Sequence, residues 1–189
     1  MMKKCSFVFG LIILCVSCAG YLQEEPKLDW TFSLEKPAAT EALTYADDSV
    51  EIKFIITPKQ IGFDIQNKTD SEIKIDWDEI FYRSPAGRSL RVIHRETQYA
   101  DKDSLQVPTV IPPNEKISDF IIPSELIFHL TYGGWTTAPL FDFNTYYRDK
   151  TFGLYFPLVI NGNKKEYSFE FKIGLSQIKP EKKKPPNIF

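Results

Sequence analysis

SVEIKFIITPKQIGFDIQ, residues 49–66, alternates apolar and polar side chains on both sides of a short turn. Every second residue is apolar in 50–56, and the same spacing resumes in 61–65. A period of two places the apolar side chains on one face of a strand and the polar side chains on the other. The segment therefore predicts two antiparallel strands, each with one buried face.

The same alternation continues towards the C-terminus. After a polar turn at residues 67–71, Ile73, Ile75 and Trp77 alternate with charged residues, so we expect Trp77 to lie in the core. A second turn signal, rich in proline, stands at residues 112–115. Shorter strands are expected at residues 80–83, 89–95, 107–111 and 116–122.

The clearest hairpin signal lies near the C-terminus. Apolar residues alternate in 152–160 and again in 167–173, with Asn161-Gly162-Asn163 between the two runs. Asn-Gly allows the positive φ angles that a tight hairpin turn requires. Pro157 has no N–H to donate, so we expect its strand to lie at an edge of the sheet or to contain a bulge.

These runs predict the fold class. No stretch of a dozen residues after the N-terminal segment has the apolar period of a helix. About eight short strands with turn signals predict an all-β fold, an antiparallel β-sandwich of the immunoglobulin-like kind, at residues 49–176. Residues 18–48 are interpreted as a tether and N-terminal linker, within which residues 28–34 alternate and could form a short strand.

The composition excludes several classes of protein. The chain has 189 residues, of which 43% are hydrophobic and 25% charged, and its formal net charge is −2. These values exclude a collagen-like chain, a fully disordered chain and a polytopic membrane protein. No nucleic-acid partner is expected, because such a partner requires a strong basic excess. Residues 177–189 are basic and Pro-rich, which predicts a disordered tail.

The N-terminus predicts export. Lys3 and Lys4 precede an apolar run at residues 7–16, and small residues follow it. The run fits a signal peptide and is shorter than the roughly 20 residues of a membrane-spanning helix. All three cysteines of the chain lie at or before position 18, so the exported domain cannot form a disulfide and depends on its core.

Leu14-Cys15-Val16-Ser17-Cys18 resembles the lipobox of bacterial lipoprotein signals. The resemblance implies a lipoprotein signal peptide at residues 1–17 and lipidation of Cys18, whose acyl chains, palmitate among them, anchor the protein to membrane lipid. Ala19 comes next, and in diderm bacteria a residue other than Asp there favours the outer membrane. Two alternatives stay open: an ordinary secretory signal cleaved near Ala19 or Gly20, or an uncleaved anchor.

Short motifs follow one another along the predicted domain. They are Asn67-Lys68-Thr69-Asp70, Ile73-Lys74-Ile75-Asp76-Trp77-Asp78, Arg91-Val92-Ile93-His94, Val110-Ile111-Pro112, and Gly134-Trp135 before Pro139-Leu140-Phe141. In this order they resemble a group of bacterial lipoproteins with no assigned activity. The resemblance spans residues 61–173 and implies a signal peptide, a β-rich domain and a place in the cell envelope.

The sequence offers little for catalysis or metal binding. It has no Gly-x-Ser-x-Gly motif, and His94 and His129 are its two histidines. Neither a His-x-His pair nor an EF-hand spacing occurs, and the acidic clusters at 76–79 and 101–103 are interpreted as solvated strand ends. We therefore expect no catalytic residue that the sequence can select, no metal site and no cofactor.

The most unusual stretch is residues 123–150, because it separates two predicted strands by more than compact domains usually allow. Aromatic side chains on such a loop could stack on sugar rings or anchor a protein partner. Alternatively, the loop covers the open end of the sandwich and its aromatic side chains fill that end. The candidate ligand-binding residues are Tyr132, Trp135, Phe141, Tyr146 and Tyr147.

The favoured function is a lipid-anchored protein of the bacterial cell envelope, exported and membrane-anchored, that acts as a non-enzymatic binding or assembly module. Its expected partner is an envelope protein or glycan. The alternative is an envelope glycan hydrolase with paired carboxylates, which must lie about 5–10 Å apart. A minor third hypothesis is a Ca²⁺-dependent adhesin module.

Overall fold

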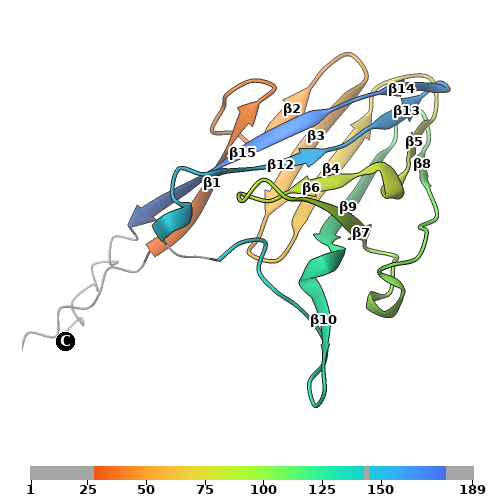
Figure 1. Cartoon of the computed structure of the whole chain (residues 1–189). Coiled ribbons are helices and arrows are strands. Elements are labelled where there is room, and N and C mark those ends of the chain that lie inside the picture. Colours follow the sequence, from red (N-terminus) through yellow and green to blue (C-terminus); the bar gives the residue numbers. More distant parts are fainter. Residues whose placement is uncertain (1–27, 143–144, 178–189) are drawn as a thin grey trace, which may run out of the picture.

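The computed structural model of the chain describes residues 28–142 and 145–177 (Figure 1). The predicted signal peptide at residues 1–17, the predicted lipidation site Cys18 and the tail from residue 178 onwards lie outside the described residues. In the described part, every regular element is a strand or a short 3₁₀ helix, and all strand pairs are antiparallel. The all-β antiparallel prediction is confirmed. No helix of this part is long and apolar enough to cross a bilayer.

The elements have the following bounds. The strands are β1 Leu28–Lys36, β2 Thr44–Ala46, β3 Val50–Ile56, β4 Ile61–Asn67, β5 Ile73–Ile75, β6 Phe81–Arg83, β7 Ser89–His94, β8 Thr109–Ile111, β9 Lys116–Pro123, β10 Ile127–Leu130, β11 Gly134–Thr137, β12 Thr151–Tyr155, β13 Leu158–Ile160, β14 Asn163–Lys165 and β15 Ser168–Gln177. The 3₁₀ helices are η1 Trp77–Glu79, η2 Tyr99–Asp101, η3 Ser124–Leu126 and η4 Thr145–Tyr147.

Most of the strands form one sheet that curls until it is nearly closed (Figure 1). Its order is β1-β15-β12-β6-β7-β9-β4-β3-β2. The end strands β1 and β2 follow each other in the chain, and an isolated bridge between Leu34 and Thr40 joins β1 to the segment that leads into β2. The sheet therefore surrounds an interior between two facing walls. One wall includes β12 and β15, and the other includes β3 and β4.

A smaller sheet continues the strands of the large sheet at one end of the molecule. Its order is β14-β13-β5-β8, and these strands adjoin β15, β12, β4 and β9 along the chain. The pairing of β13 with β5, in which Leu158 lies opposite Ile75, joins strands that come from the two walls. The small sheet therefore covers this end of the interior, at the upper right of Figure 1.

Aromatic side chains from the two walls meet in the core. The ring of Phe54 on β3 lies 4.8 Å from that of Phe169 on β15, measured between centroids. Trp77 in η1 is fully buried, as the alternation predicts, and its Nε1 donates a hydrogen bond to Thr109 Oγ1 at 2.9 Å. Because a buried indole N–H without a partner would cost stability, this bond fixes how the ring lies.

The large sheet begins earlier in the chain than the sequence predicts. Residues 28–36 pair with β15, so the possible short strand at residues 28–34 is confirmed. Residues 44–46, in the segment interpreted as a linker, pair with β3. The partner of residues 28–36 lies at the other end of the chain. Short alternation alone therefore could not distinguish a paired edge strand from a linker.

The predicted strand at residues 152–160 is divided in two. β12 ends before Phe156 and β13 begins after Pro157, so the chain passes there from the large sheet to the small one. The missing N–H of Pro157 explains why the ladder is interrupted at this point. The predicted turn that follows is confirmed, because Asn161 and Gly162 have φ angles of 47° and 75°.

Candidate functional site

The stretch at residues 123–150 is not one loop. After η3, β10 and β11 form a projecting hairpin, and the chain then returns to the core at Leu140 and Phe141. β10 and β11 pair with each other along their whole length, and neither pairs with another strand of the described chain. Figure 1 shows this hairpin, labelled β10, extending away from both larger sheets.

The β10–β11 hairpin exposes apolar side chains on both faces. Phe128 and Leu130 alternate onto one face and are 43% and 47% exposed. Trp135 is 43% exposed and lies opposite His129 in the register, with its ring edge-on to the imidazole. At the tip, Tyr132 is 101% exposed. Apolar side chains gathered in this way mark interaction sites more often than solvated loops.

The same hairpin carries no formal charge. Between Glu125 and Asp142 the chain has no Asp, Glu, Lys or Arg, although 25% of all residues are charged. Strands with open edges that face only water usually carry charged side chains, which keep them from associating. An exposed hairpin that is both apolar and uncharged is therefore a candidate contact surface.

The base of the hairpin is fixed to the body of the molecule. Ile127 is buried together with Ile93 of β7 and Ile122 of β9 in a small second cluster. Lys102 Nζ donates a hydrogen bond to the carbonyl oxygen of Ser124 in η3 at 3.1 Å. Because these contacts hold the start of β10, the hairpin projects in a defined direction.

The segment after the hairpin fills the core. The Tyr82 hydroxyl donates a hydrogen bond to the carbonyl oxygen of Leu140 at 3.0 Å. Phe141 is only 6% exposed, and its ring centroid lies 6.4 Å from that of Phe32 and 5.9 Å from that of Phe152. Phe141 is therefore part of the core and does not belong to a ligand-binding surface, which corrects the interpretation from sequence.

The remaining candidate tyrosines also lie apart from the hairpin. Tyr147 in η4 is half-buried and packs on the core, with its ring 5.7 Å from that of Phe141. Its neighbour Tyr146 is exposed. The five predicted ligand-binding residues therefore do not form one site, because Tyr132 and Trp135 alone lie on the hairpin.

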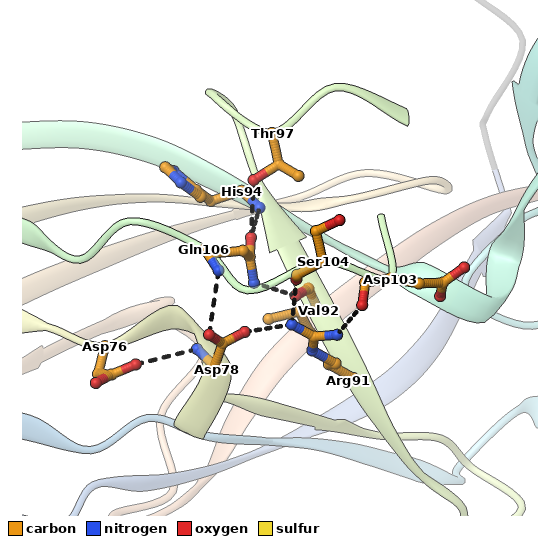
Figure 2. Close-up of polar contacts among 9 residues, drawn as sticks. All are labelled: Asp76, Asp78, Arg91, Val92, His94, Thr97, Asp103, Ser104 and Gln106. Atoms are coloured by element: carbon orange, nitrogen blue, oxygen red, sulfur yellow. Dashed lines mark hydrogen bonds and ion pairs between the residues drawn. The ribbon is translucent and has the colours of Figure 1, made fainter. Parts of the chain in front are cut away.

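A polar network holds the loop between β7 and β8 (Figure 2). The same loop supports the base of the hairpin through Lys102. The buried Gln106 donates from Nε2 to the Val92 carbonyl oxygen at 2.8 Å. Its Oε1 accepts from the His94 N–H at 3.2 Å and from Thr97 Oγ1 at 2.9 Å. Its own backbone N–H donates to Asp78 Oδ2 at 3.1 Å. These bonds satisfy the Gln106 amide, so the network stabilises the loop.

Arg91 ties the same loop to η1 (Figure 2). Its guanidinium donates to the Asp78 carboxylate and to the carbonyl oxygen of Ser104. Burial alone would raise the pKa of Asp78, but the bonds from Arg91 and Gln106 outweigh it and hold that pKa below its usual value. Across the residues that the structure describes, no three His, Cys, Asp or Glu side chains gather as metal ligands.

His94 is close to an acid but has almost no access to solvent. Its ring stacks on that of Trp77, with centroids 4.1 Å and planes 5° apart, and its Nδ1 lies 3.2 Å from Asp119 Oδ2. The side chain is 3% exposed, and His129 lies away on the hairpin. The pair with Asp119 therefore orients a core histidine and gives a substrate little to reach.

No carboxyl group with a shifted pKa in the described part has the raised pKa of a glycoside-hydrolase acid. Among the described residues, every carboxyl with a shifted pKa has it lowered, because hydrogen bonds to the ionised form outweigh any effect of burial. A general acid at neutral pH requires a raised pKa. The lowered groups are Asp47, Asp64, Asp78 and Glu170.

A groove of about 360 Å³ lies on the outer face of the large sheet over β12. A Cβ at Gly153, in its floor, would lie 3.1 Å from the backbone oxygen of Phe169, so a larger residue there would be crowded. Lys36 and Glu170 form an ion pair across 2.9 Å at this groove. Arg83 also lines the groove, so its surface is charged and polar, whereas that of the hairpin is apolar.

Comparisons of the chain with known protein families, curated proteins and solved structures found no match. The candidate site therefore rests on the geometry of the hairpin. The sequence interpretation selected Tyr132 and Trp135 as candidates and did not select Phe128 and Leu130, which are exposed on the same hairpin. The turn at Gly133-Gly134, where Gly134 has a φ of 70°, and the lack of charge around it are the signals that could have found the hairpin.

Proposed function

We propose that the protein is a lipid-anchored protein of the bacterial cell envelope that acts as a non-enzymatic contact module. The β10–β11 hairpin is its contact element. One observation carries the proposal: a hairpin with a fixed base and no formal charge exposes Phe128, Leu130, Tyr132 and Trp135. A surface of this kind costs solubility unless it has a partner, and nothing in the described chain covers it.

The lipid anchor in this proposal is supported by residues 14–18, which resemble a lipobox. Two or three acyl chains at Cys18 would give durable attachment, whereas one chain would be marginal. Attachment would also hold the hairpin near the envelope and raise its effective concentration there.

A non-enzymatic role is favoured over the hydrolase alternative by electrostatics. The shifted carboxyl groups have pKa values below their usual range because hydrogen bonds stabilise their ionised forms, which is the wrong direction for an acid catalyst. His94 is buried against Trp77. Neither feature provides a reactive group at a surface that a glycan could reach.

The finer architecture belongs to the same proposal. We infer an immunoglobulin-like sandwich whose two walls are continuous around one edge. The contact of Phe54 with Phe169 across the interior and the burial of Trp77 against the opposite strands support it, since a buried tryptophan commonly lies at the centre of such sandwiches.

Metabolic labelling with an alkyne fatty acid tests the anchor. The full chain is expressed in a diderm bacterium as wild type, Cys18→Ala and Cys15→Ala. We expect label on wild type and on Cys15→Ala, because Cys15 would leave with the signal peptide, and no label on Cys18→Ala. The labelled protein should remain with the membrane fraction until detergent is added. Unlabelled wild type in the soluble fraction would show ordinary secretion and refute the proposal.

A further inference from the structure

The hairpin tip has the composition of a segment that meets a lipid bilayer at its surface. Tyr132 and Trp135 each combine an apolar ring with a polar atom, and such side chains concentrate where a membrane meets water. Phe128 and Leu130 add purely apolar surface beside them. No Asp, Glu, Lys or Arg of this segment would have to leave water.

We propose that the tip of the β10–β11 hairpin inserts into the interfacial layer of a lipid bilayer. The inference deepens the proposed function, on which it rests for the presence of a nearby membrane, by naming the lipid surface as what the hairpin contacts.

The open edges of the hairpin limit how deeply it enters. β10 and β11 pair only with each other within the described chain, so the outer edge of each strand keeps backbone N–H and C=O groups without strand partners. Such groups are not tolerated in the hydrocarbon core, but the interface still contains water that can bond to them. The insertion is therefore shallow and involves the tip.

The size of the exposed surface favours lipid over a protein partner. One large aromatic side chain buries roughly 150–250 Å² when it is fully covered. Three of the four exposed apolar side chains of the hairpin are less than half exposed. All four together therefore present a few hundred Å² of accessible surface to a partner. A stable protein complex needs roughly 800 Å² on each partner. A bilayer makes no such demand, because it adapts to a small projecting tip.

Because its base is fixed, the hairpin loses little conformational entropy on insertion. Ile127 is buried at the start of β10, and Leu140 is buried soon after β11 ends. The hairpin is thus held at both ends before it meets the membrane, and little conformational freedom is lost on contact. Lipidation at Cys18 and insertion of the hairpin would form two separate attachments, the arrangement that makes peripheral membrane binding stable.

Tryptophan quenching by lipids with brominated acyl chains tests the insertion. The full chain, purified from membranes, is reconstituted into phosphatidylethanolamine–phosphatidylglycerol vesicles with and without bromine. We expect bromine to lower the emission of wild type, because Trp135 lies at the bilayer surface. Of the other two tryptophans, Trp77 is buried in the core and Trp30 of β1 is partly buried against it. Trp135→Phe should lose this quenched part of the emission.

Two further variants separate insertion from folding. Leu130→Asp combined with Tyr132→Asp keeps Trp135 but places charge at the tip, so quenching should disappear while the melting temperature stays close to that of wild type. Val110→Asp changes an apolar side chain that is similarly exposed but lies on β8 in the small sheet, and it should leave quenching unchanged. Quenching that is the same in all variants would overturn the inference.

The anchor and the insertion fail in different ways. A wild type that carries acyl label at Cys18 but shows no bromine quenching would keep the anchor and overturn insertion, and a photoreactive group at position 132 that cross-links to a protein would then identify the other class of partner. A wild type without acyl label that is still quenched would refute the anchor and support insertion.

Discussion

Asp47 is the residue at which a turn of the large sheet is tied to strands far away in the chain. Its Oδ1 accepts from the backbone N–H groups of Ser49 and Val50 at 2.8 and 2.9 Å. Its Oδ2 accepts from Lys165 Nζ at 2.8 Å and from the Tyr167 hydroxyl at 3.1 Å. Partial burial alone would raise the pKa of Asp47, but these donors outweigh it and lower that pKa to about 2.

The lowered pKa makes part of the stability dependent on pH. The folded-state pKa of Asp47 lies below the unfolded value, so the stabilisation is complete above about pH 4 and disappears as pH falls towards 2. We expect Asp47→Asn to lower the free energy of unfolding at pH 7 by about 2 kcal/mol. Urea denaturation at pH 7, 4 and 2 should show the gap between wild type and variant closing between pH 4 and 2.

Asp48→Asn is the matched control, because Asp48 is the next residue and is exposed. It should change the free energy of unfolding by no more than about 0.5 kcal/mol. If the difference in free energy of unfolding between wild type and Asp47→Asn stays constant over the whole pH range, the carboxylate charge does not contribute to stability.

Individual residues were predictable when their role followed from local alternation. Trp77 was placed in the core because it continues the apolar phase of Ile73 and Ile75. The role of Gln106 could not be predicted, since its partners Val92 and His94 lie in another element and nothing near Gln106 in the sequence marks it as buried.

At the scale of elements, the segment between β9 and β12 has two parts with different roles. The sequence left open whether its aromatic residues bind a ligand or fill the end of the sheet. In the structure, Phe141 fills the core, where it is buried against Phe32 and Phe152, whereas Tyr132 lies on an exposed tip. Filling therefore describes the part around Phe141, and binding stays a prediction for the hairpin.

Substitutions in the two parts should lower stability by very different amounts. Phe141→Ala should lower the free energy of unfolding by about 3–5 kcal/mol, because it leaves a cavity in the core. Tyr132→Ala should change it by less than about 0.5 kcal/mol, because the side chain is fully exposed. Chemical denaturation of both variants provides the measurement. Equal losses in the two variants would mean that the hairpin also packs against the body.

Strands with several alternating residues were predicted close to their observed bounds, as β3, β4 and β9 show. The predicted strands were wrong where long-range contacts, and not the local sequence, determine where a strand begins or ends. The run at residues 152–160 looks continuous, but Pro157 and the change of sheet divide it. The hairpin of β10 and β11 was missed because its strands are short and their exposed apolar side chains do not alternate with charged ones.

For the whole molecule, the sequence predicted antiparallel strands but not the order in which they pair. β1 and β15 lie side by side although they stand at opposite ends of the described chain. No local pattern records such a pairing, because it results from how all the apolar faces are buried together. The curl of the sheet and its cover by β13 and β5 follow from the same long-range packing.

Hydrogen exchange should reveal how stability is distributed over this architecture. β4 pairs on both sides, with β3 and β9, whereas β10 and β11 pair on one side only. In the absence of membranes, the hairpin amides should exchange at least about tenfold faster than those of β4, the ratio that 1.4 kcal/mol of local stability produces. Mass spectrometry of peptic fragments measures both segments. Equal protection would show that the hairpin is as stable as the centre of the sheet.

The small sheet has a consequence for cooperativity. Each of its strands is a short step along the chain from a strand of the large sheet, and β13 joins β5 across the two walls. Neither sheet can separate without pulling strands out of the other, so the body has no modular part that could unfold alone. Its stability is a shared property: damage to any strand of the body lowers the stability of all of them, while the exposed positions of the hairpin can change at little cost to the rest.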